Sequence, residues 1–552
     1  MTNNTSKSRS KAVSKAMVTA GAKSSARKPF YITTTLPYVN AEPHIGHALE
    51  FIRADVIARY KKLLGFDVFF NTGTDEHGIK IYQKATQDHI EPQKYVDAAA
   101  AKFKEMLPIL GISKDITFTR TTDAHHITAA QEFWKIADKN GLIYKKNYAI
   151  KYCVGCELEK TDSELVDGKC PLHPLQNIEV IEEENDFFRF SVYQKALMDL
   201  YERGTDIESN AESKHSFVIP NSRLNEIRAF VERGVEDFSI SRLASKMPWG
   251  IPVPGDETHV IYVWFDALIN YISAVGWPDD QGTFGKWWKD TGGVVQYCGK
   301  DNLRQQSAMW QAMLMAVGLP PSKVVIINGF VTGEGGVKMS KSLGNVVNPI
   351  DVVGEYGTDA LRYFVTKELH PFEDSPFTMD KFKETYNAGL ANGIGNLTSR
   401  IMKMAEAHIE PLNKLAIEID QPKKDDSTIE QLPSTQNLRP NGDSGNSRLI
   451  IETFADIQSS EFFDAIESFN LQKAMNIIWE RIARLDQKIQ KDQPFALVKT
   501  DKDKGVKLIA ELVSSLNEVA VMLLPFLPET ATAILTCIHA NKMPEKPLFM
   551  RK

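Results

Sequence analysis

The sequence predicts an α/β protein in which a doubly wound parallel sheet is split by an insertion and followed by an all-α helical bundle. Three observations favour this class: a strand–helix–strand pattern over residues 31–70, a second group of short apolar runs over 260–327, and no strand pattern after Gly389. The stretch between the two apolar groups, about 115–240, is charged and holds three of the five cysteines, as expected for an insertion.

The first apolar group begins with a β-branched run over residues 31–35, which is typical of a buried strand. Pro37 marks a turn, and apolar residues then recur at helical spacing over 45–60. Gly65 ends this helix, and residues 68–70 predict a second strand. Two strands joined by a helix predict parallel pairing with a right-handed crossover.

The second apolar group predicts strands over residues 260–264, 294–298 and 324–327, with a helix over 308–317 before the last of them. Beyond Gly389 the apolar residues follow helical spacing instead. They are Phe463, Ile466, Leu471, Met475, Ile478, Ile482 and Leu485, then Leu508, Leu512, Leu516, Val519 and Leu523. This region predicts a helical bundle, interrupted by a polar loop over 421–447 that is rich in Pro, Asn, Asp, Ser and Gly.

Length and composition indicate a multi-domain globular enzyme. The chain has 552 residues, 43% of them hydrophobic and 25% charged, and no window approaches the roughly 18 consecutive apolar residues of a membrane-spanning helix. We therefore expect no membrane partner. The 65 basic and 71 acidic residues give a net charge of −6, so nucleic acid would have to be bound by local patches.

Residues 1–28 carry seven Lys or Arg and no acidic residue, and are expected to form an unfolded basic arm. An organelle transit peptide is the alternative, but such peptides are typically Arg-rich and amphipathic, whereas this arm is Lys-rich. We therefore predict a cytoplasmic protein, with an organelle matrix as the alternative. The odd number of cysteines and their clustering also favour a reducing compartment.

The first motif with chemical meaning is His44-Ile-Gly46-His47, between the first strand and the crossover helix. The N-terminus of a helix binds phosphate, and Gly46 lets a nucleotide approach the backbone. His44 and His47 lie one turn apart, so both can donate to phosphate oxygens. Taken alone, the motif fits a surface histidine pair that caps the helix equally well.

The second motif, Lys338-Met-Ser-Lys341-Ser, follows the last predicted strand and a glycine-rich stretch, 333–336, expected to be a hairpin tip. Its lysines can reach a polyphosphate as point charges while a leaving pyrophosphate gains negative charge. Alone, the motif is more typical of a solvated basic loop. Both motifs together, each after a strand in one half of a split sheet, predict a nucleotide site.

A metal site is predicted by Cys153, Cys156, Cys170 and His173, which form two pairs with two residues between the members of each pair. Three thiolates and one imidazole suit a tetrahedral structural Zn²⁺, and four protein ligands leave no position open for chemistry. A redox pair of Cys153 and Cys156 is the alternative, but it leaves Cys170 and His173 unexplained. We expect one Zn²⁺ per chain.

With these motifs in place, the sequence resembles the class I aminoacyl-tRNA synthetases, and most closely the methionyl-tRNA synthetase family, over essentially the whole chain after residue 28. The resemblance rests on Thr35-Leu-Pro-Tyr-Val-Asn40, Gly73-Thr-Asp-Glu-His-Gly78, Tyr262-Val-Trp-Phe-Asp-Ala267, Gly299-Lys-Asp301 and the lysine motif. It implies a methionine–tRNA ligase that uses ATP, with Mg²⁺, to form methionyl-adenylate and then charges tRNA(Met).

The resemblance also implies a division into domains. A split Rossmann catalytic domain would occupy residues 29–115 and 241–330, on either side of a connective insertion with a zinc knuckle over 116–240. The lysine loop and a region that contacts the tRNA stem would follow over 331–388. A helical anticodon-binding domain would occupy 389–552. No appended dimerisation domain is expected, and this favours a monomer.

By the same resemblance, seven residues form the methionine pocket. Six match family positions: Asp75 would hold the α-ammonium, while Leu36, Tyr38, Trp264, Ala267 and Tyr271 would enclose the thioether. Aromatic and aliphatic walls suit an unbranched, polarizable side chain. The resemblance places ATP at His44, Gly46, His47, Asp301, Lys338 and Lys341, with Asp301 on the adenosine ribose and the two histidines and two lysines as catalytic residues.

Two positions depart from the family pattern. The family often has Phe-His where this chain has Gln305 and Gln306, but Gln306 can still donate to a sulfur or a tyrosine and completes the predicted pocket. The anticodon-stacking Trp of the family corresponds to Phe495, which keeps a π-face for a base. Asn392, Asn396 and Arg400 match anticodon-contacting positions and are expected on one helical face, although they also fit a solvated polar face.

Several other functions share part of these patterns. The isoleucine, valine and leucine enzymes carry an editing domain for which the insertion is too short, and the cysteine enzyme has a zinc-binding Cys where this chain has Leu36-Pro-Tyr38. Small nucleotidyltransferases share the histidine motif but lack the helical bundle. A catalytically idle tRNA-binding paralogue is disfavoured because both histidines and both lysines are present.

Overall fold

The computed structural model describes residues 27–156, 158–160, 164–206, 214–337, 339, 346–409 and 461–552. Nearly all of the predicted basic arm, the predicted loop over 421–447, and the lysines 338 and 341 lie outside the described residues. No helix in the described part is long and apolar enough to cross a membrane.

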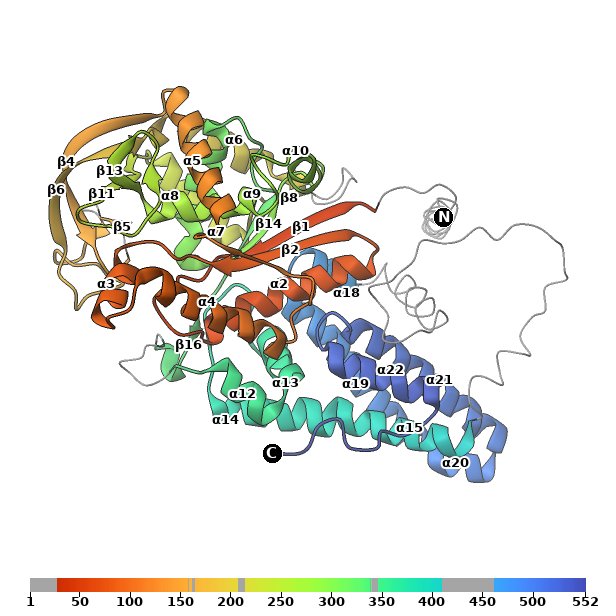
Figure 1. The fold of residues 1–552 in the computed structure, drawn as a ribbon. Helices are drawn as coiled ribbons and strands as arrows, with labels where there is room; N and C mark the ends of the chain where they lie inside the picture. Colours follow the sequence, from red (N-terminus) through yellow and green to blue (C-terminus); the bar gives the residue numbers. More distant parts are fainter. Residues whose placement is uncertain are drawn as a thin grey trace, which may run out of the picture.

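A six-stranded parallel sheet lies at the centre of the molecule, with the strand order β3-β2-β1-β14-β15-β9 (Figure 1). Its strands are β1 (Pro29–Thr34), β2 (Asp67–Thr74), β3 (Thr117–Arg120), β9 (Val218–Ile219), β14 (Val295–Gly299) and β15 (Val324–Asn328). The two halves of the sheet join where β1 pairs with β14. The order of the strands reverses at this point, and such a switch point opens a crevice at the carboxyl ends of the strands. The predicted split, doubly wound fold is confirmed.

The predicted strand–helix–strand unit is also confirmed: helix α2 (Ile45–Leu63) joins β1 to β2. Helices α3 (Ile79–Gln87) and α4 (Pro92–Ile109) then lead to β3. Both outer strands of the sheet, β3 and β9, come from the range 116–240 that was predicted as the insertion. Residues of the insertion therefore complete the central sheet on each edge.

The strand predicted over residues 260–264 is wrong in both its extent and its sheet. Strand β13 (Asp256–Ile261) ends at Ile261 and pairs antiparallel with β11 (Ser241–Leu243) and β12 (Pro252–Val253), outside the central sheet. The chain then turns into helix α8 (Val263–Leu268), because the amides of Phe265 and Asp266 bond to the carbonyl of Tyr262. A short buried helix and a buried strand show the same apolar run in the sequence.

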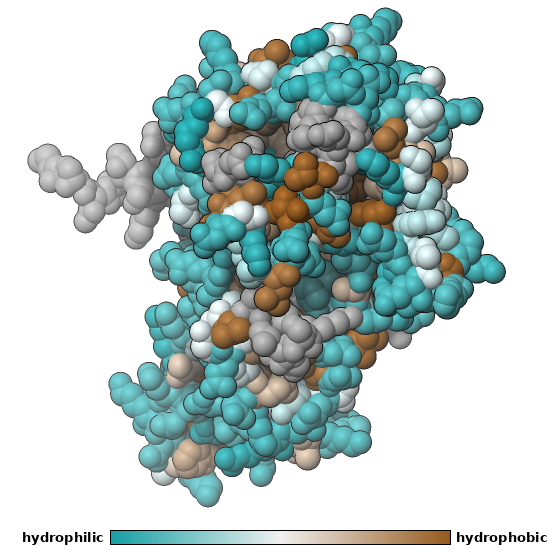
Figure 2. All heavy atoms as spheres, turned by 90° about the vertical axis from the view of Figure 1, so that its left-hand side faces the viewer, coloured by the Kyte–Doolittle hydropathy of each residue, from teal (hydrophilic) through white to brown (hydrophobic). Residues whose placement is uncertain are grey.

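The rest of the insertion is an arm built on a long antiparallel hairpin of β4 (Ile143–Cys153) and β6 (Glu179–Phe188). Strands β5 (Leu158–Glu159) and β10 (Phe238–Ser239) extend this sheet. Helices α5 (Ala124–Lys139), α6 (Gln194–Arg203) and α7 (Asn221–Glu232), the turn η2 (Phe190–Tyr193), and the short pair β7 (Thr205–Asp206) and β8 (Lys214–His215) complete the insertion. Figure 2, which looks onto this side, shows a mainly hydrophilic surface with hydrophobic groups near its centre.

Short helices follow α8 around the second half of the sheet: α9 (Asn270–Ser273), α10 (Gln281–Phe284), η3 (Gly285–Lys289), η4 (Lys300–Asn302), η5 (Gln305–Met309) and α11 (Trp310–Ala316). After β15, strand β16 (Val331–Thr332) pairs with β17 (Ser375–Pro376). The expected hairpin tip at 333–336 is instead one 3₁₀ turn, η6 (Glu334–Gly336), in which Gly335 and Gly336 have positive φ.

Beyond β17 every regular element of the described chain is a helix, and this confirms the predicted bundle. Three connecting helices precede β17, namely α12 (Pro349–Tyr356), α13 (Thr358–Tyr363) and η8 (Phe364–Glu368), and a fourth, α14 (Met379–Thr385), follows it. The bundle itself contains η9 (Tyr386–Gly395), α15 (Asn396–His408), α18 (Glu461–Glu467), α19 (Leu471–Asp492), α20 (Pro494–Thr500), α21 (Lys502–Leu523) and α22 (Pro528–Ala540).

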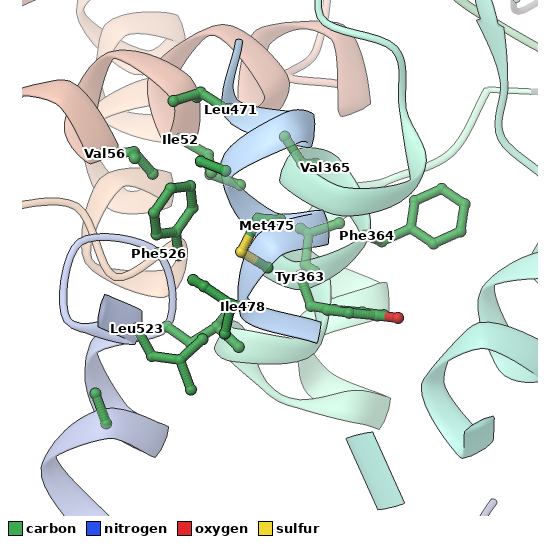
Figure 3. Packing of buried hydrophobic residues seen from close by; sticks show 14 of the residues in the cluster. Ile52, Val56, Tyr363, Phe364, Val365, Leu471, Met475, Ile478, Leu523 and Phe526 are labelled. Atoms are coloured by element: carbon green, nitrogen blue, oxygen red, sulfur yellow. The ribbon is translucent and has the colours of Figure 1, made fainter. Parts of the chain in front are cut away.

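The bundle shares one hydrophobic core with one face of the central sheet. Figure 3 shows how they meet: Ile52 and Val56 on α2 face Met475 and Ile478 on α19, with Phe526 from the turn before α22 beside them. Helix α2 therefore begins next to the crevice of the sheet and packs along its length against the bundle. Its 19 residues span about 28 Å.

Candidate active site and metal centre

A cavity of about 360 Å³ opens at the carboxyl ends of β1, β2, β14 and β15, where the strand order reverses. All the site residues predicted for methionine and ATP within the described part of the catalytic region line it. They are Leu36, Tyr38, His44, Gly46, His47, Asp75, Trp264, Ala267, Tyr271, Asp301 and Gln306. The structure thus brings together residues that are separated by up to 270 positions in the chain.

The loops after β1 and β2 form one side of this cavity and are tied together by backbone hydrogen bonds. The amide of Val39 bonds to the carbonyl of Asp75 at 3.1 Å, and the amide of Asp75 bonds to the carbonyl of Pro37 at 2.9 Å. This pairing extends the sheet by one bridge between Tyr38 and Asp75. The backbone of Asp75 is therefore held in register with that of Tyr38, and both residues line the cavity.

His44 and His47 cap the N-terminus of α2 reciprocally. Nδ1 of His44 accepts from the amide of Gly46 at 3.1 Å, and Nδ1 of His47 accepts from the amide of His44 at 3.2 Å. The two rings stack with their centroids 3.8 Å apart. A Cβ at Gly46 would lie 3.0 Å from the His44 ring, so a glycine there allows this close packing.

This capping determines the tautomer of each imidazole. Because Nδ1 accepts a hydrogen bond in both rings, the neutral form carries its proton on Nε2. Burial, with the neighbouring His44 as a second cause, lowers the pKa of His47 well below its usual value. His47 is therefore a neutral donor at physiological pH. The two histidines cap the helix through Nδ1 and keep Nε2–H as a donor, so the capping alternative is compatible with the phosphate-binding prediction.

The apolar wall of the cavity is anchored by a buried polar network. Nε2 of Gln306 donates to the hydroxyl of Tyr271 at 2.7 Å, and Oε1 of Gln306 accepts from Gln296 at 2.9 Å. The hydroxyl of Tyr31 donates to the carbonyl of Tyr271 at 2.9 Å. The expectation that Gln306 can donate to a tyrosine is confirmed, and Gln305 is buried in the same helix, η5.

Sequence reasoning missed Glu50, which also lines the cavity. Its Oε1 accepts from the amide of Thr35 at 2.6 Å. Burial, with a small contribution from the charge of Asp301, raises the pKa of Glu50 to about 8. A signal was present, because Glu50 follows His47 by three residues and so lies on the same face of α2.

Asp301 lines the cavity at the carboxyl end of β14, and its position depends on a glycine. A Cβ on Gly299 would come within 2.6 Å of the Asp301 carboxylate. Phe330 and Val331, which precede the lysine loop, line the same part of the cavity. The described segment that leads toward Lys338 and Lys341 therefore leaves from the cavity, and these two lysines lie outside the described residues.

The four predicted metal ligands converge between β4 and β6. Their ligand atoms all lie within 4.8 Å of one another. Sγ of Cys156 is 3.4 Å from Sγ of Cys170 and 3.3 Å from Nδ1 of His173, and Cys153 is 3.8 Å from the same nitrogen. Ligands about 2.3 Å from one tetrahedral ion lie about 3.8 Å apart, so this donor set fits such an ion.

This candidate metal site adjoins the cavity. Cys156 is one of the cavity's lining residues, and Nζ of Lys80 donates to the carbonyl of Gly155 at 2.6 Å. Gly155 also permits the turn to close, because a Cβ there would lie 2.3 Å from Cγ of His173. A second contact joins the knuckle to the start of η5, where Arg304 binds Glu164.

The predicted anticodon residues lie in the bundle, and their arrangement differs from the expectation in one respect. Gly393 has a non-helical ψ of −109°, and this kink in η9 separates Asn392 from Asn396 at the start of α15. The two asparagines therefore do not share one regular helical face, but both are exposed. Arg400 forms an ion pair with Asp486 of α19.

Phe495 is 52% exposed at the first turn of α20. A large aromatic side chain in this position contributes little to the core, and its ring is accessible to a partner.

Comparisons with known proteins agree with this geometry. The family model described as "tRNA synthetases class I (M)" matches residues 30–177 and 175–402. The methionine–tRNA ligase of Thermotoga maritima is 37% identical over 522 residues, which cover 94% of this chain and 76% of that protein. The methionine–tRNA ligase of Rickettsia conorii is 37% identical over 526 residues, which cover 94% of each chain.

Solved structures show the same similarity. The Mycobacterium tuberculosis methionyl-tRNA synthetase in complex with methionyl-adenylate matches with a TM-score of 0.78 and 31% identity, over 94% of this chain and 95% of that one. Its ligand-free form matches with a TM-score of 0.73 and 27% identity, over 96% and 99% of the two chains.

Proposed function

This chain belongs to the family of class I methionyl-tRNA synthetases, and on that premise we propose that its cavity activates methionine with ATP and that the product is transferred to tRNA(Met). One observation carries the proposal at the level of the site. A single cavity holds a carboxylate, Asp75, among aromatic and aliphatic walls, and the N-terminus of α2 with its two histidines opens onto the same space.

In this proposal methionine occupies the part of the cavity near Asp75 and Tyr271. The Asp75 carboxylate pairs with the α-ammonium group. Leu36, Tyr38, Trp264 and Ala267 surround the side chain, which loses water on binding and gains dispersion contacts. The donors of Tyr271 and Gln306 at the inner end face a weak thioether acceptor.

ATP lies along the N-terminus of α2. Gly46 lets the phosphates approach the helix, where the backbone dipole and the Nε2–H groups of His44 and His47 stabilise negative charge. Asp301 accepts from the ribose hydroxyls. Lys338 and Lys341 from the neighbouring loop would pair with the β- and γ-phosphates, and the Mg²⁺ that accompanies ATP would supply further positive charge there.

Two displacements then complete the reaction. A carboxylate oxygen of methionine attacks the α-phosphorus, and the bond to pyrophosphate breaks, which gives methionyl-adenylate. The terminal ribose hydroxyl of the tRNA next attacks the methionyl carbonyl, and AMP leaves. No side chain becomes covalently attached, so the protein acts by positioning the reactants and by stabilising the charge that develops.

We assign Zn²⁺ to the centre formed by Cys153, Cys156, Cys170 and His173. Three thiolates and one imidazole in tetrahedral arrangement are typical of structural zinc, and the ion would hold the turns of the knuckle closed. A cysteine cluster that binds metal instead of forming disulfides is typical of a reducing compartment, which supports a cytoplasmic location.

The helical bundle is proposed to bind the anticodon of tRNA. Its exposed Phe495 offers a stacking surface, and Asn392, Asn396 and Arg400 offer hydrogen bonds to unstacked bases. In this proposal the catalytic domain activates methionine, the zinc knuckle has a structural role, and the bundle binds the anticodon.

Amino-acid-dependent ATP–pyrophosphate exchange tests the proposed activity. Purified protein should exchange pyrophosphate into ATP with methionine and not with leucine, isoleucine, valine or cysteine. Exchange with another amino acid would assign the chain a different substrate. A protein that binds tRNA(Met) but supports no exchange would be an idle paralogue.

A further inference from the structure

A buried carboxylate lies directly behind the proposed methionine pocket, between two imidazoles. Oδ2 of Asp266 is 2.7 Å from Nδ1 of His77, and Oδ1 of Asp266 is 2.7 Å from Nε2 of His126. The side chain of Asp266 is fully buried, and His126 and His77 are 1% and 5% exposed. None of the three residues lines the cavity.

Each member of this group lies next to residues that do line the cavity. His77 follows Asp75 by two residues in the loop after β2. Asp266 lies between Trp264 and Ala267 on α8. Three segments therefore meet at the Asp266 carboxylate: the loop after β2 with the proposed ammonium site, helix α8 with the apolar wall, and helix α5.

The network continues to a third part of the pocket. Nδ1 of His126 is 3.0 Å from the hydroxyl of Ser273, and Ser273 follows Tyr271 by two residues on α9. The neighbouring His125 contacts the carbonyl of Ser273 through Nε2 at 2.9 Å. Helix α5 thus holds α9, and with it the Tyr271 ring, at a fixed distance from α8.

The charge of Asp266 makes these contacts strong. Burial alone would raise the pKa of Asp266, but the contacts with His77 and His126 outweigh it and lower the pKa below its usual value. The carboxylate is therefore ionised, and both imidazoles donate an N–H to it. Hydrogen bonds to a buried charge are shorter and about twice as strong as neutral ones.

We propose that Asp266, with His77 and His126, is a positioning group that sets the spacing between the ammonium-binding loop and the thioether wall, and so determines the affinity for methionine. This inference rests on the proposed function. The carboxylate touches no substrate. It acts through Asp75, Trp264 and Tyr271, which all move if the two imidazoles lose their common partner.

The chain allows a test that separates positioning from packing. The amide nitrogen of glutamine reaches the position of Nε2 of a histidine, and that of asparagine reaches the position of Nδ1. His126→Gln and His77→Asn should therefore keep the donor to Asp266, whereas His126→Leu and His77→Leu remove it. Asp266→Asn keeps the shape but loses the charge. Asp359→Asn is the matched control, because Asp359 is a buried carboxylate on α13 that accepts from Thr530, away from the cavity.

Steady-state ATP–pyrophosphate exchange gives the KM for methionine, the KM for ATP and kcat for each variant. We expect the leucine variants and Asp266→Asn to raise the KM for methionine about 10- to 100-fold, as for loss of a hydrogen bond to a buried charge, with the KM for ATP changed less than about twofold. His126→Gln and His77→Asn should restore the KM for methionine to within about threefold. Asp359→Asn should lower thermal stability and leave both KM values unchanged.

Three outcomes overturn the inference. One is a wild-type KM for methionine in all folded variants. Another is a rise in the KM for methionine that is equal in the leucine variants and in their Gln and Asn counterparts. The third is a parallel rise in the KM for methionine and the KM for ATP. If the leucine variants do not fold, Asp266→Asn decides by the same criteria. Failure of the proposed function is distinguishable, because the wild-type protein would then show no exchange with methionine, and the inference would fall with it.

Discussion

The guanidinium group of Arg362 lies 2.8 Å from the carboxylate of Asp55, and neither side chain is exposed to solvent. Asp55 belongs to α2, the helix that begins at His44 in the cavity. The same guanidinium donates to the carbonyls of Phe526 at 2.7 Å and Pro525 at 3.0 Å, in the turn before α22. One ion pair therefore fixes the helix of the active site to the bundle.

Replacing Arg362 should destabilise the protein strongly. Arg362→Met leaves the Asp55 carboxylate buried with fewer partners, and breaking a buried pair in this way costs about 3–5 kcal/mol. Arg481→Met is the matched control, because Arg481 pairs with Glu518 between α19 and α21 at a partly exposed position and should contribute about 0–1 kcal/mol. Urea unfolding followed by circular dichroism measures the free energy of unfolding of both variants and of wild type. Similar losses in the two variants would show that the buried pair has no special importance.

Asp55 should also make the stability of the fold depend on pH in the acidic range. Burial raises the pKa of Asp55, but Arg59, Arg362 and Ser113 outweigh it, so the folded pKa lies below the unfolded value of about 3.9. A lowered carboxylate pKa stabilises the fold above the unfolded pKa, and this contribution disappears as pH falls through the folded pKa. The difference in melting temperature between wild type and Asp55→Asn should be largest near pH 7 and shrink below about pH 4. A constant difference would contradict the assignment.

Glu50 should have the opposite pH dependence. Its pKa is raised to about 8 by burial, with a small contribution from Asp301, whereas the unfolded value is about 4.3. The folded state then binds more protons than the unfolded state between these values, so stability falls as pH rises from about 4 to 8. Glu50→Gln removes this dependence. The variant should melt above wild type at pH 8.5 and close to it at pH 4, as differential scanning fluorimetry can show. A variant that melts below wild type at pH 8.5 would mean that Glu50 is ionised in the folded protein.

The knuckle should lose its metal when Gly155 gains a side chain. Gly155→Ala places a Cβ 2.3 Å from the His173 ring, so this ligand must shift away from the three thiolates. Elemental analysis should find about one equivalent of Zn²⁺ in wild type and much less in the variant. Gly354→Ala on α12 is the control, because a Cβ there meets no atom within 4 Å. Full zinc content in Gly155→Ala would refute the proposed ligand set.

Phe495→Ala should separate tRNA charging from amino-acid activation. Loss of a stacking surface costs about 1–3 kcal/mol per base, which corresponds to a roughly 5- to 100-fold loss of aminoacylation. Exchange of pyrophosphate with methionine should stay near the wild-type rate, since Phe495 is exposed and distant in sequence from the cavity residues. Met543→Ala, at another exposed position after α22, should change neither rate. A parallel fall of both rates in Phe495→Ala would show that this residue supports the fold instead.

Short-range features were predictable from the sequence because local chemistry determines them. The unit of β1, α2 and β2 follows from the spacing of its apolar residues and from Gly65. The ligands Cys153 and Cys156 are recognisable because a metal requires specific donors at short spacing. The histidine motif was informative for the same reason, since a phosphate site needs glycine and donors at the N-terminus of a helix.

Features that depend on contacts between distant segments were determined only by the tertiary structure. Residues 262–264 carry an apolar run that suits a strand or a buried helix, and the turn at Tyr262 determined the helix. Strand β9 has only two residues and is defined by its pairing with β15. Asp266 and Arg362 are charged residues that a sequence assigns to the surface, and they are buried because partners from other segments satisfy their charges. Periodicity along one segment carries no information about such partners, so only the folded chain could reveal them.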